Sequence, residues 1–123
     1  MNNLILRSDL LKESHELVRA LIEDITQKEF VPFIDDLYRN IGKGMNSFWC
    51  YFENDFTDED EAFVKKFDYK DVLFEDILEN KILISFKELF YYMKIASVRY
   101  CKQFPEYERQ LKGLLNYFAK KII

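Results

Sequence analysis

The spacing of apolar residues along the chain changes twice, near Gly42 and again at Ser85. Before Gly42 and after Ser85, apolar residues recur every three or four positions, which is typical of amphipathic helices. Between these two points, short runs rich in aromatic and β-branched residues predict strands. Strands grouped between helices indicate an α+β fold. We therefore expect one domain over residues 1–123, with a small, mostly antiparallel sheet flanked by about four helices in the order α-α-β-β-β-α-α.

Two helices are predicted before the strands. Ser8 is a candidate cap for the first, whose apolar stripe extends over residues 10–25. The second is expected to begin within residues 26–31. Gly42 is expected to end it, because glycine tolerates the left-handed conformation that follows a last helical turn.

Two further helices are predicted after the strands. Ser85 and Glu88 have the spacing of a capping box, in which each residue satisfies a backbone N–H group of the other. Phe104 ends this third helix, because the residue before a proline is disfavoured in the helical region. Pro105 then suits the first position of a fourth helix, whose apolar face follows at residues 111–118.

Three segments are predicted as strands, at residues 47–52, 62–69 and 81–85. Residues 71–79 mix apolar side chains with acids, and this pattern fits either a strand end or a short helical turn. Large apolar side chains are expected to form the core, namely Phe48 or Trp49, Phe67, Ile82, Ile84, Leu89, Met93, Leu111 and Leu115.

The composition indicates a folded protein of the cytosol. Of the 123 residues, 49% are hydrophobic and 17% aromatic, which argues against disorder over most of the chain. No segment approaches the roughly 20 apolar residues that span a bilayer, and the N-terminus lacks the features of a signal peptide. Cys50 and Cys101 suggest neither a metal pattern nor a disulfide framework. We therefore expect a reduced, cytoplasmic environment.

Residue types that usually carry catalysis form no recognisable site. The single histidine, His15, is expected on the surface of the first helix, and no spacing links it to Cys50 or Cys101 as a nucleophilic pair. The contiguous acids of residues 58–61 lack the turn glycine and the spaced ligands of a calcium loop. We therefore expect no catalytic residue, no metal and no cofactor, so the chain is not predicted to be an enzyme.

An acidic segment, residues 53–79, dominates the charge distribution. It contains eleven acids and three bases, whereas residues 80–123 contain nine bases and three acids, and the whole chain has a net charge of −4. Like charges packed this densely repel one another, so folding alone does not require them. The segment is expected to attract a basic protein, while the net charge disfavours direct binding of nucleic acid. The alternative is a solvated loop that only keeps the protein soluble.

Aromatic residues and strand–helix junctions between Gly44 and Leu115 form a recognisable pattern. The residues that carry it are Cys50-Tyr51-Phe52 before the acidic loop, Phe63-Val64, Phe67, Ile82-Leu83-Ile84-Ser85, Glu88-Leu89-Phe90-Tyr91-Tyr92, Ala96, Tyr100, Pro105 and Leu114-Leu115. This pattern resembles the ribonuclease-toxin immunity proteins of bacterial contact-dependent growth inhibition systems. The resemblance implies a non-enzymatic cytoplasmic protein that binds and neutralises one cognate ribonuclease toxin, expected to be a tRNase.

The acidic segment is the expected toxin-binding site, because a ribonuclease must hold phosphates and therefore has a basic groove. An acidic surface can occupy such a groove and speed association by electrostatic attraction. The partner is expected to be the C-terminal domain of the toxin, with no membrane partner, and the oligomeric state is left open. The residues predicted to bind it are Asp55, Asp58, Glu59, Asp60, Glu61, Asp68, Asp71, Glu75 and Asp76.

Two other functions remain as alternatives. The first is a small cytosolic adaptor or regulatory protein that binds a partner through a helical face, with its basic C-terminus meeting an acidic partner. It requires an exposed apolar face on the third or the fourth helix. The second is an enzyme that uses Cys50 or Cys101. A toxin gene immediately upstream would distinguish an immunity protein from an adaptor.

Overall fold

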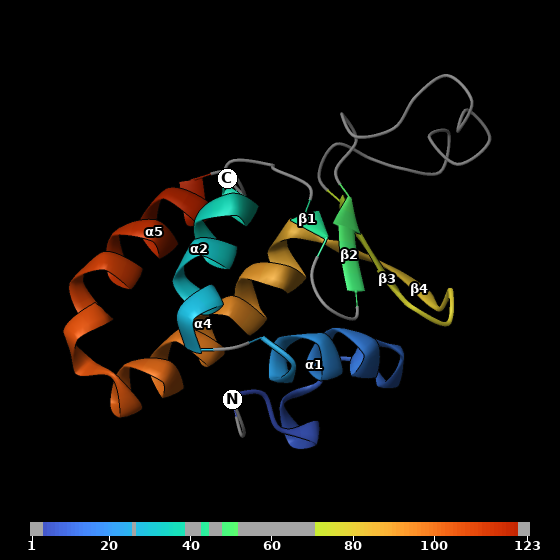
Figure 1. The fold of residues 1–123 in the computed structure, drawn as a ribbon, viewed down its shortest axis with the longest axis horizontal. Helices are drawn as coiled ribbons and strands as arrows, with labels where there is room; N and C mark the ends of the chain where they lie inside the picture. Colours follow the sequence, from blue (N-terminus) through green and yellow to red (C-terminus); the bar gives the residue numbers. More distant parts are fainter. Residues whose placement is uncertain (1–3, 26, 39–42, 45–47, 52–70, 121–123) are drawn as a thin grey trace.

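The computed structural model describes residues 4–25, 27–38, 43–44, 48–51 and 71–120 (Figure 1). The α-helices of this part are α1 (Glu16–Glu23), α2 (Gln27–Tyr38), α4 (Phe86–Gln103) and α5 (Glu108–Lys120). The strands are β1 (Lys43–Gly44), β2 (Phe48–Tyr51), β3 (Asp71–Asp76) and β4 (Lys81–Ser85). Short 3-10 turns lie at Arg7–Asp9, Glu13–His15 and Pro105–Tyr107. Helices, strands and helices follow one another as predicted, and the α+β class is confirmed.

The strands of the described residues form one antiparallel sheet in the order β1-β2-β3-β4. Residues 71–76, whose sequence fits a strand end or a helical turn, form strand β3, which pairs with both β2 and β4. In this register Phe74 lies opposite Cys50 on one side and opposite Ile82 on the other. The predicted strand at residues 62–69 and the predicted helix end at Gly42 lie outside the described residues.

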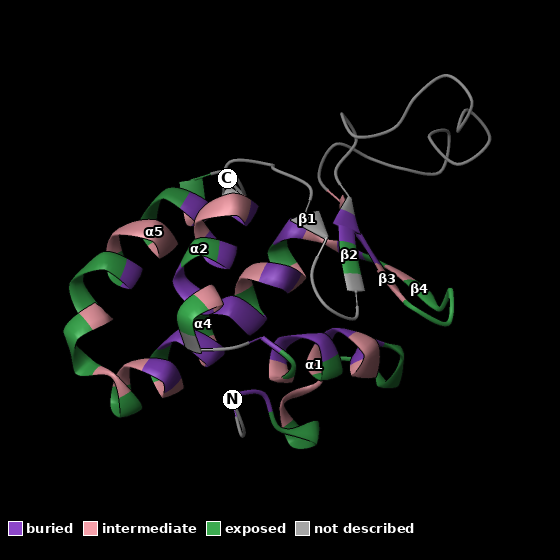
Figure 2. Ribbon diagram, viewed as in Figure 1, coloured by how far each residue is buried: buried purple, intermediate pink, exposed green. Residues whose placement is uncertain are grey.

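The two faces of the sheet differ in what they contact. Cys50, Phe74 and Ile84 belong to the main core together with side chains of α1 and α4, and both helices contact the sheet. Figure 2 shows this buried surface between the sheet and the helices. Because side chains alternate along a strand, the residues between them point to the opposite, outer face. The outer face carries Trp49, Leu73, Glu75, Lys81 and Leu83.

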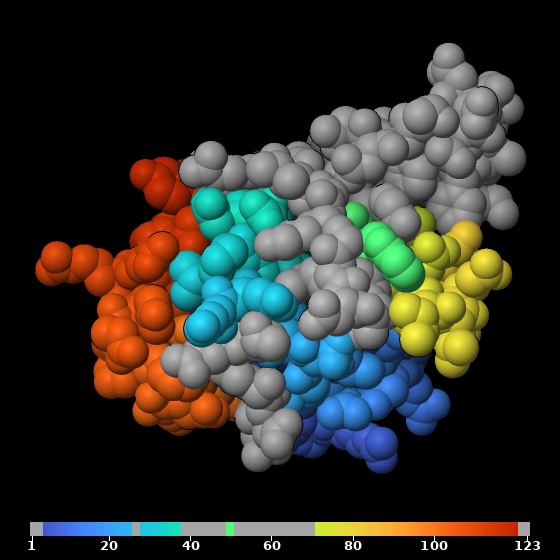
Figure 3. Space-filling model, viewed as in Figure 1, coloured from blue at the N-terminus to red at the C-terminus, as the bar shows by residue number. Residues whose placement is uncertain are grey.

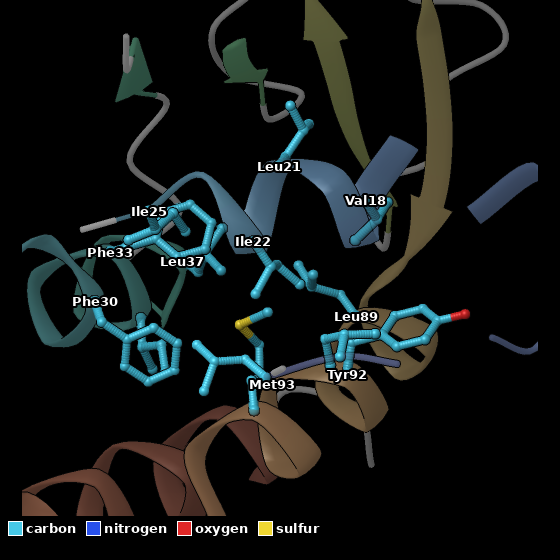
Figure 4. Close-up of a cluster of buried hydrophobic side chains, with 14 of the residues drawn as sticks. Val18, Leu21, Ile22, Ile25, Phe30, Phe33, Leu37, Leu89, Tyr92 and Met93 are labelled. Atoms are coloured by element: carbon cyan, nitrogen blue, oxygen red, sulfur yellow. The ribbon is translucent and has the colours of Figure 1, made fainter. Parts of the chain in front are cut away.

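Side chains from α1, α2 and α4 converge in the main core around Ile22 and Met93, which are at most 1% exposed (Figure 4). Phe30 of α2 stacks on Tyr100 of α4, with 4.5 Å between the ring centroids. Phe118 of α5 is fully buried in the same cluster. This packing gives the sheet a rigid support on one face and leaves the outer face to carry other side chains.

The core prediction is confirmed in part. Ile84, Leu89, Met93 and Leu111 are buried as predicted, whereas Ile82 and Leu115 are half-buried and pack against the core. Trp49 is 37% exposed, because the alternation of β2 places it on the face opposite Cys50. The side chain of Phe48 and all of Phe67 lie outside the described residues.

The N-terminal segment, residues 4–15, differs from the predicted first helix, since α1 begins only at Glu16. Backbone N–H groups of this segment bond side chains that are distant in the sequence. Those of Leu4 and Ile5 donate to Oε1 of Glu23, at 2.8 and 3.0 Å. The N–H of Leu11 donates to the hydroxyl of Tyr92, at 2.9 Å. Tertiary hydrogen bonds to α1 and α4 therefore hold this segment in place ahead of α1.

The capping box at the start of α4 is confirmed. The hydroxyl of Ser85 accepts a hydrogen bond from the N–H of Glu88 at 3.1 Å, and the Glu88 carboxylate accepts one from the N–H of Ser85 at 3.2 Å. The helix ends at Gln103, as predicted from the proline that follows. Pro105 begins a 3-10 turn, so α5 begins at Glu108. Among the described residues, no helix has both the length and the apolarity that a membrane span requires.

Candidate functional site

The structure describes three of the nine predicted site residues, and all three lie on β3. They are Asp71, Glu75 and Asp76. The other six, which are Asp55, Asp58, Glu59, Asp60, Glu61 and Asp68, lie outside the described residues. Because β3 pairs on both sides, its backbone is fixed within the sheet and gives the three acids defined positions.

The three acids do not form one compact patch. Asp71 lies opposite Ser85, and Asp76 lies at the other end of β3, where the chain turns into β4. They are five residue steps apart along the strand, which corresponds to roughly 16 Å. Tyr51 pairs with Leu73, so the chain leaves β2 and enters β3 at the Asp71 end of the sheet. The other six predicted site residues lie between β2 and β3 in the sequence, so the segment that contains them joins the sheet at that end.

Glu75 lies on the outer face between Trp49 and Lys81, which flank it on the neighbouring strands. The Glu75 carboxylate forms an ion pair with the Lys81 ammonium, with 3.3 Å between Oε2 and Nζ. Their side chains are 20% and 44% exposed. An ion pair at such an exposure contributes roughly 0.2–1 kcal/mol, and it offsets the charge of Glu75 locally.

Asp76 holds the turn between β3 and β4. Its Oδ1 accepts hydrogen bonds from the N–H groups of Leu78 (2.9 Å) and Asn80 (2.8 Å), and its Oδ2 accepts one from the Asn80 side-chain amide (3.0 Å). These bonds, with the Asn80 amide first, lower the pKa of Asp76 below its ordinary value. The side chain thus carries a charge and fixes the local backbone at the same time.

The turn held by Asp76 presents two adjacent aliphatic side chains to solvent. Ile77 is 64% exposed and Leu78 is 76% exposed, the largest exposures of any bulky apolar side chain in the described part of the chain. Glu79 follows with a φ of 65°, the left-handed conformation. The sequence did not single out these residues, because an apolar pair within an apolar run looks like part of a core strand. The turn-forming role of Asp76 was not evident either.

His15 is buried, which corrects the prediction of a helix-surface histidine. Its side chain is 3% exposed, and its Nδ1 lies 2.6 Å from the hydroxyl of Tyr92. The Tyr92 oxygen already accepts the N–H of Leu11, so all groups are satisfied when Tyr92 donates to a neutral imidazole. The other ring nitrogen lies 3.6 Å from a carboxylate oxygen of Glu88. The burial arises because the N-terminal segment is held against α4, on residues far away in sequence.

Burial has the largest single effect on the pKa values in the cluster formed by His15, Tyr92 and Glu88. It lowers the pKa of His15, against the opposing effect of Glu88, and raises the pKa of Tyr92. Hydrogen bonds from Ser85 lower the pKa of Glu88 although burial opposes them. Within the described residues, His15 faces Tyr92 and Glu88. The arrangement fixes the N-terminal segment rather than activating a nucleophile.

The two cysteines differ in their exposure. Cys50 is buried within the sheet, and Cys101 is half-buried on α4. Burial raises the pKa of the Cys101 thiol, which keeps it protonated and weakly nucleophilic. Within the described residues, no three histidine, cysteine or acidic side chains come together as metal ligands.

A groove of about 310 Å³ lies between α4 and α5. It is lined by Ser97, Val98, Cys101, Lys102, Glu108, Leu111, Lys112 and Leu115. Val98 is 53% exposed. The charged side chains of the lining are two lysines and one glutamate, so the groove has a net positive charge. The hydroxyl of Ser97 is buried and makes no hydrogen bond to any described residue. This groove is the exposed apolar helical face that the adaptor alternative requires.

Comparison with known proteins identifies a family. The family model described as CDI immunity protein matches residues 14–115. Neither the curated proteins nor the solved structures gave a match. The matched range includes the sheet, the β3–β4 turn, α4 and all the lining residues of the groove between α4 and α5.

Proposed function

The chain belongs to the CDI immunity protein family, and we propose that it binds and neutralises one cognate ribonuclease toxin, a tRNase, delivered by contact-dependent growth inhibition. It does so in the cytoplasm, as a non-enzymatic inhibitor that contacts the C-terminal domain of the toxin. The binding residues are drawn from the nine acids predicted from the sequence. Binding is direct between the two proteins, without nucleic acid or a cofactor.

The acidic segment is the observation that carries this proposal. It concentrates eleven acids against three bases in residues 53–79, within the range that the family model matches. A ribonuclease binds phosphates and therefore presents a basic surface, to which an acidic segment is complementary. The charges of opposite sign raise the association rate before any close contact forms. They also block the groove to RNA, because the acids occupy the place of phosphates.

The described acids contribute to binding in different ways. Asp76 carries a negative charge, but its carboxylate oxygens hold the turn, so its main contribution is to geometry. Glu75 is paired with Lys81 and adds little net charge. Asp71 marks the end of the sheet at which the acids of residues 52–70 join β3. The steering charge therefore resides mainly in that segment.

The test is a binding titration with the toxin domain encoded immediately upstream, combined with a growth-protection assay. Reversing Asp58, Glu59, Asp60 and Glu61 together to lysine should slow association and weaken protection, with a smaller effect on dissociation. If this variant binds and protects like the parent, the loop is only a solvated surface.

A charge-matched control separates local charge from net charge. The pair Asp60→Lys/Glu61→Lys changes the total charge as much as Glu13→Lys/Glu106→Lys, two exposed acids outside the acidic segment. The first pair should slow association more strongly than the second. Equal effects would mean that only net charge matters and that the acidic segment is not the binding surface.

A second candidate function, the adaptor, is favoured by the groove between α4 and α5. Exposed Val98 and the basic residues Lys102 and Lys112 suit an amphipathic segment with acidic flanks. Val98→Glu should abolish binding to such a partner, because it places a charge in the apolar part of the groove. If Val98→Glu prevents toxin binding and the acid reversals do not, the helical face is the interface.

A further inference from the structure

The turn between β3 and β4, residues 76–80, is called the hairpin tip here. Its two aliphatic side chains, Ile77 and Leu78, contribute nothing to the main core and are mostly exposed. Turn positions usually carry polar residues or glycine, so an adjacent aliphatic pair here has no role that folding explains. Exposed apolar residues that cluster on a surface mark sites of interaction.

The hairpin tip is preformed. The N–H of Glu79 donates to the carbonyl of Asp76 at 3.1 Å, and the N–H of Asp76 donates to the carbonyl of Asn80 at 3.0 Å. The Asp76 side chain adds hydrogen bonds to the N–H groups of Leu78 and Asn80. A loop that is already ordered loses little conformational entropy on binding, so more of its contact energy appears as affinity.

The surroundings of the hairpin tip define the chemistry of its partner. Glu75, Asp76 and Glu79 are acids, and Lys81 is the single base among residues 71–81. Trp49 lies opposite Glu75 on the outer face and is 37% exposed, so an aromatic side chain is placed two residues along β3 from the start of the aliphatic pair. Figure 3 shows the β3–β4 hairpin (yellow) at the end of the molecule opposite α5 (orange to red). A partner can therefore approach the hairpin without contacting α5.

We propose that Ile77 and Leu78 anchor the toxin interface by entering an apolar pocket on the toxin that basic side chains border. This inference rests on the proposed function and adds an apolar contact to the acidic one. A symmetric pairing of two hairpin tips does not fit, because Glu75, Asp76 and Glu79 of the two copies would face one another. A basic toxin surface instead complements these acids while its pocket buries the two aliphatic side chains.

The two parts of the interface have different kinetic effects. Long-range charge mainly sets the association rate, whereas buried anchors mainly set the dissociation rate. Removing the apolar groups at the hairpin tip should therefore raise the dissociation rate and leave association nearly unchanged. Charge reversal at residues 58–61 should have the opposite profile.

The experiment measures binding kinetics of the purified full chain to the toxin domain encoded upstream. Ile77→Ser/Leu78→Ser should raise the dissociation rate at least about 30-fold, the change that defines a strong anchor. Tyr117→Ser on α5, an exposed aromatic (52%) at the other end of the molecule, should dissociate like the parent. Ile77→Ala/Leu78→Ala, which keeps the turn sequence close to the parent, should also dissociate faster.

Each outcome has a separate meaning. If the parent binds and both hairpin-tip variants dissociate at the parent rate, this inference is wrong while the proposed function stands. If the parent does not bind the toxin domain, the proposed function itself fails. Gel filtration at rising concentration adds a further test, because self-association that the serine variant abolishes would assign the hairpin tip to a second copy instead.

Discussion

Removing a single hydroxyl, by Tyr92→Phe, tests how the N-terminal segment is held. The Tyr92 oxygen accepts the N–H of Leu11 at 2.9 Å and lies 2.6 Å from Nδ1 of His15. The variant removes the hydrogen bond to Leu11, which contributes about 0.5–1.5 kcal/mol, and leaves the buried His15 nitrogen unpaired, which costs about 1–3 kcal/mol. The free energy of unfolding should therefore fall by about 1.5–4.5 kcal/mol.

Urea denaturation measures this change, and Tyr91→Phe is the matched control. The Tyr91 hydroxyl also donates a hydrogen bond to the N-terminal segment, to the carbonyl of Asp9 at 3.1 Å, but in an exposed setting. Water replaces that bond, so the control should lose no more than about 0.5–1 kcal/mol. If Tyr92→Phe loses no more stability than Tyr91→Phe, the buried hydrogen bonds do not hold the segment.

Three further predictions concern pH, the core and the hairpin tip. Because burial lowers the pKa of His15, the unfolded chain binds a proton near 6.5 that the folded protein resists, so stability should fall as pH drops from 7 towards 5. His15→Gln should remove this slope in pH-dependent urea melts, and an unchanged slope would exclude His15 as its source. Leu89→Ala should lose about 2–5 kcal/mol in denaturant melts, because Leu89 is fully buried and a cavity remains, whereas a loss below about 0.5 kcal/mol would contradict this core. Glu79→Gly should raise the free energy of unfolding by about 0.5–1 kcal/mol, because glycine adopts a φ of 65° without strain, and a loss of stability would argue against that conformation.

Local signals predicted the second half of the fold well. The Ser85–Glu88 capping box and the stop before Pro105 depend on groups within four residues of one another, so the sequence contains all the information that they need. Alternation predicted that Ile84 is buried, and helical spacing predicted the same for Leu89 and Met93. These elements form the rigid support behind the sheet.

Contacts between residues far apart in the sequence explain the features of the N-terminal segment that local patterns did not predict. His15 meets Tyr92 across 77 residues, and Leu11 meets it across 81, so no pattern near either residue reveals the contact. The first predicted helix is confirmed as α1, but its predicted start at Ser8 was wrong, because the chain before Glu16 forms 3-10 turns held by contacts with residues distant in the sequence. Burial of His15 is likewise a property of tertiary packing.

The sequence predicted the negative charge of the candidate site but not the roles of its individual residues. A count of acids identifies residues 53–79, but it does not separate Asp76, which holds a turn, from acids that contact a partner. Ile77 and Leu78 follow β3 directly, so their pattern does not show that the strand has ended. Glu79 adopts a left-handed conformation, which the sequence usually signals by a glycine or asparagine at that position. Position 79 carries a glutamate, so the sequence did not indicate this conformation.

Inhibition of the toxin by the purified chain is the most direct test of the account. The C-terminal toxin domain encoded upstream is incubated with tRNA, and the chain is added in increasing amounts while cleavage is followed. If the chain neutralises a tRNase as proposed, cleavage should stop near one equivalent, because a tight complex would cover the groove that holds the phosphates. Cleavage that continues unchanged at a large excess of the chain would contradict the proposed function.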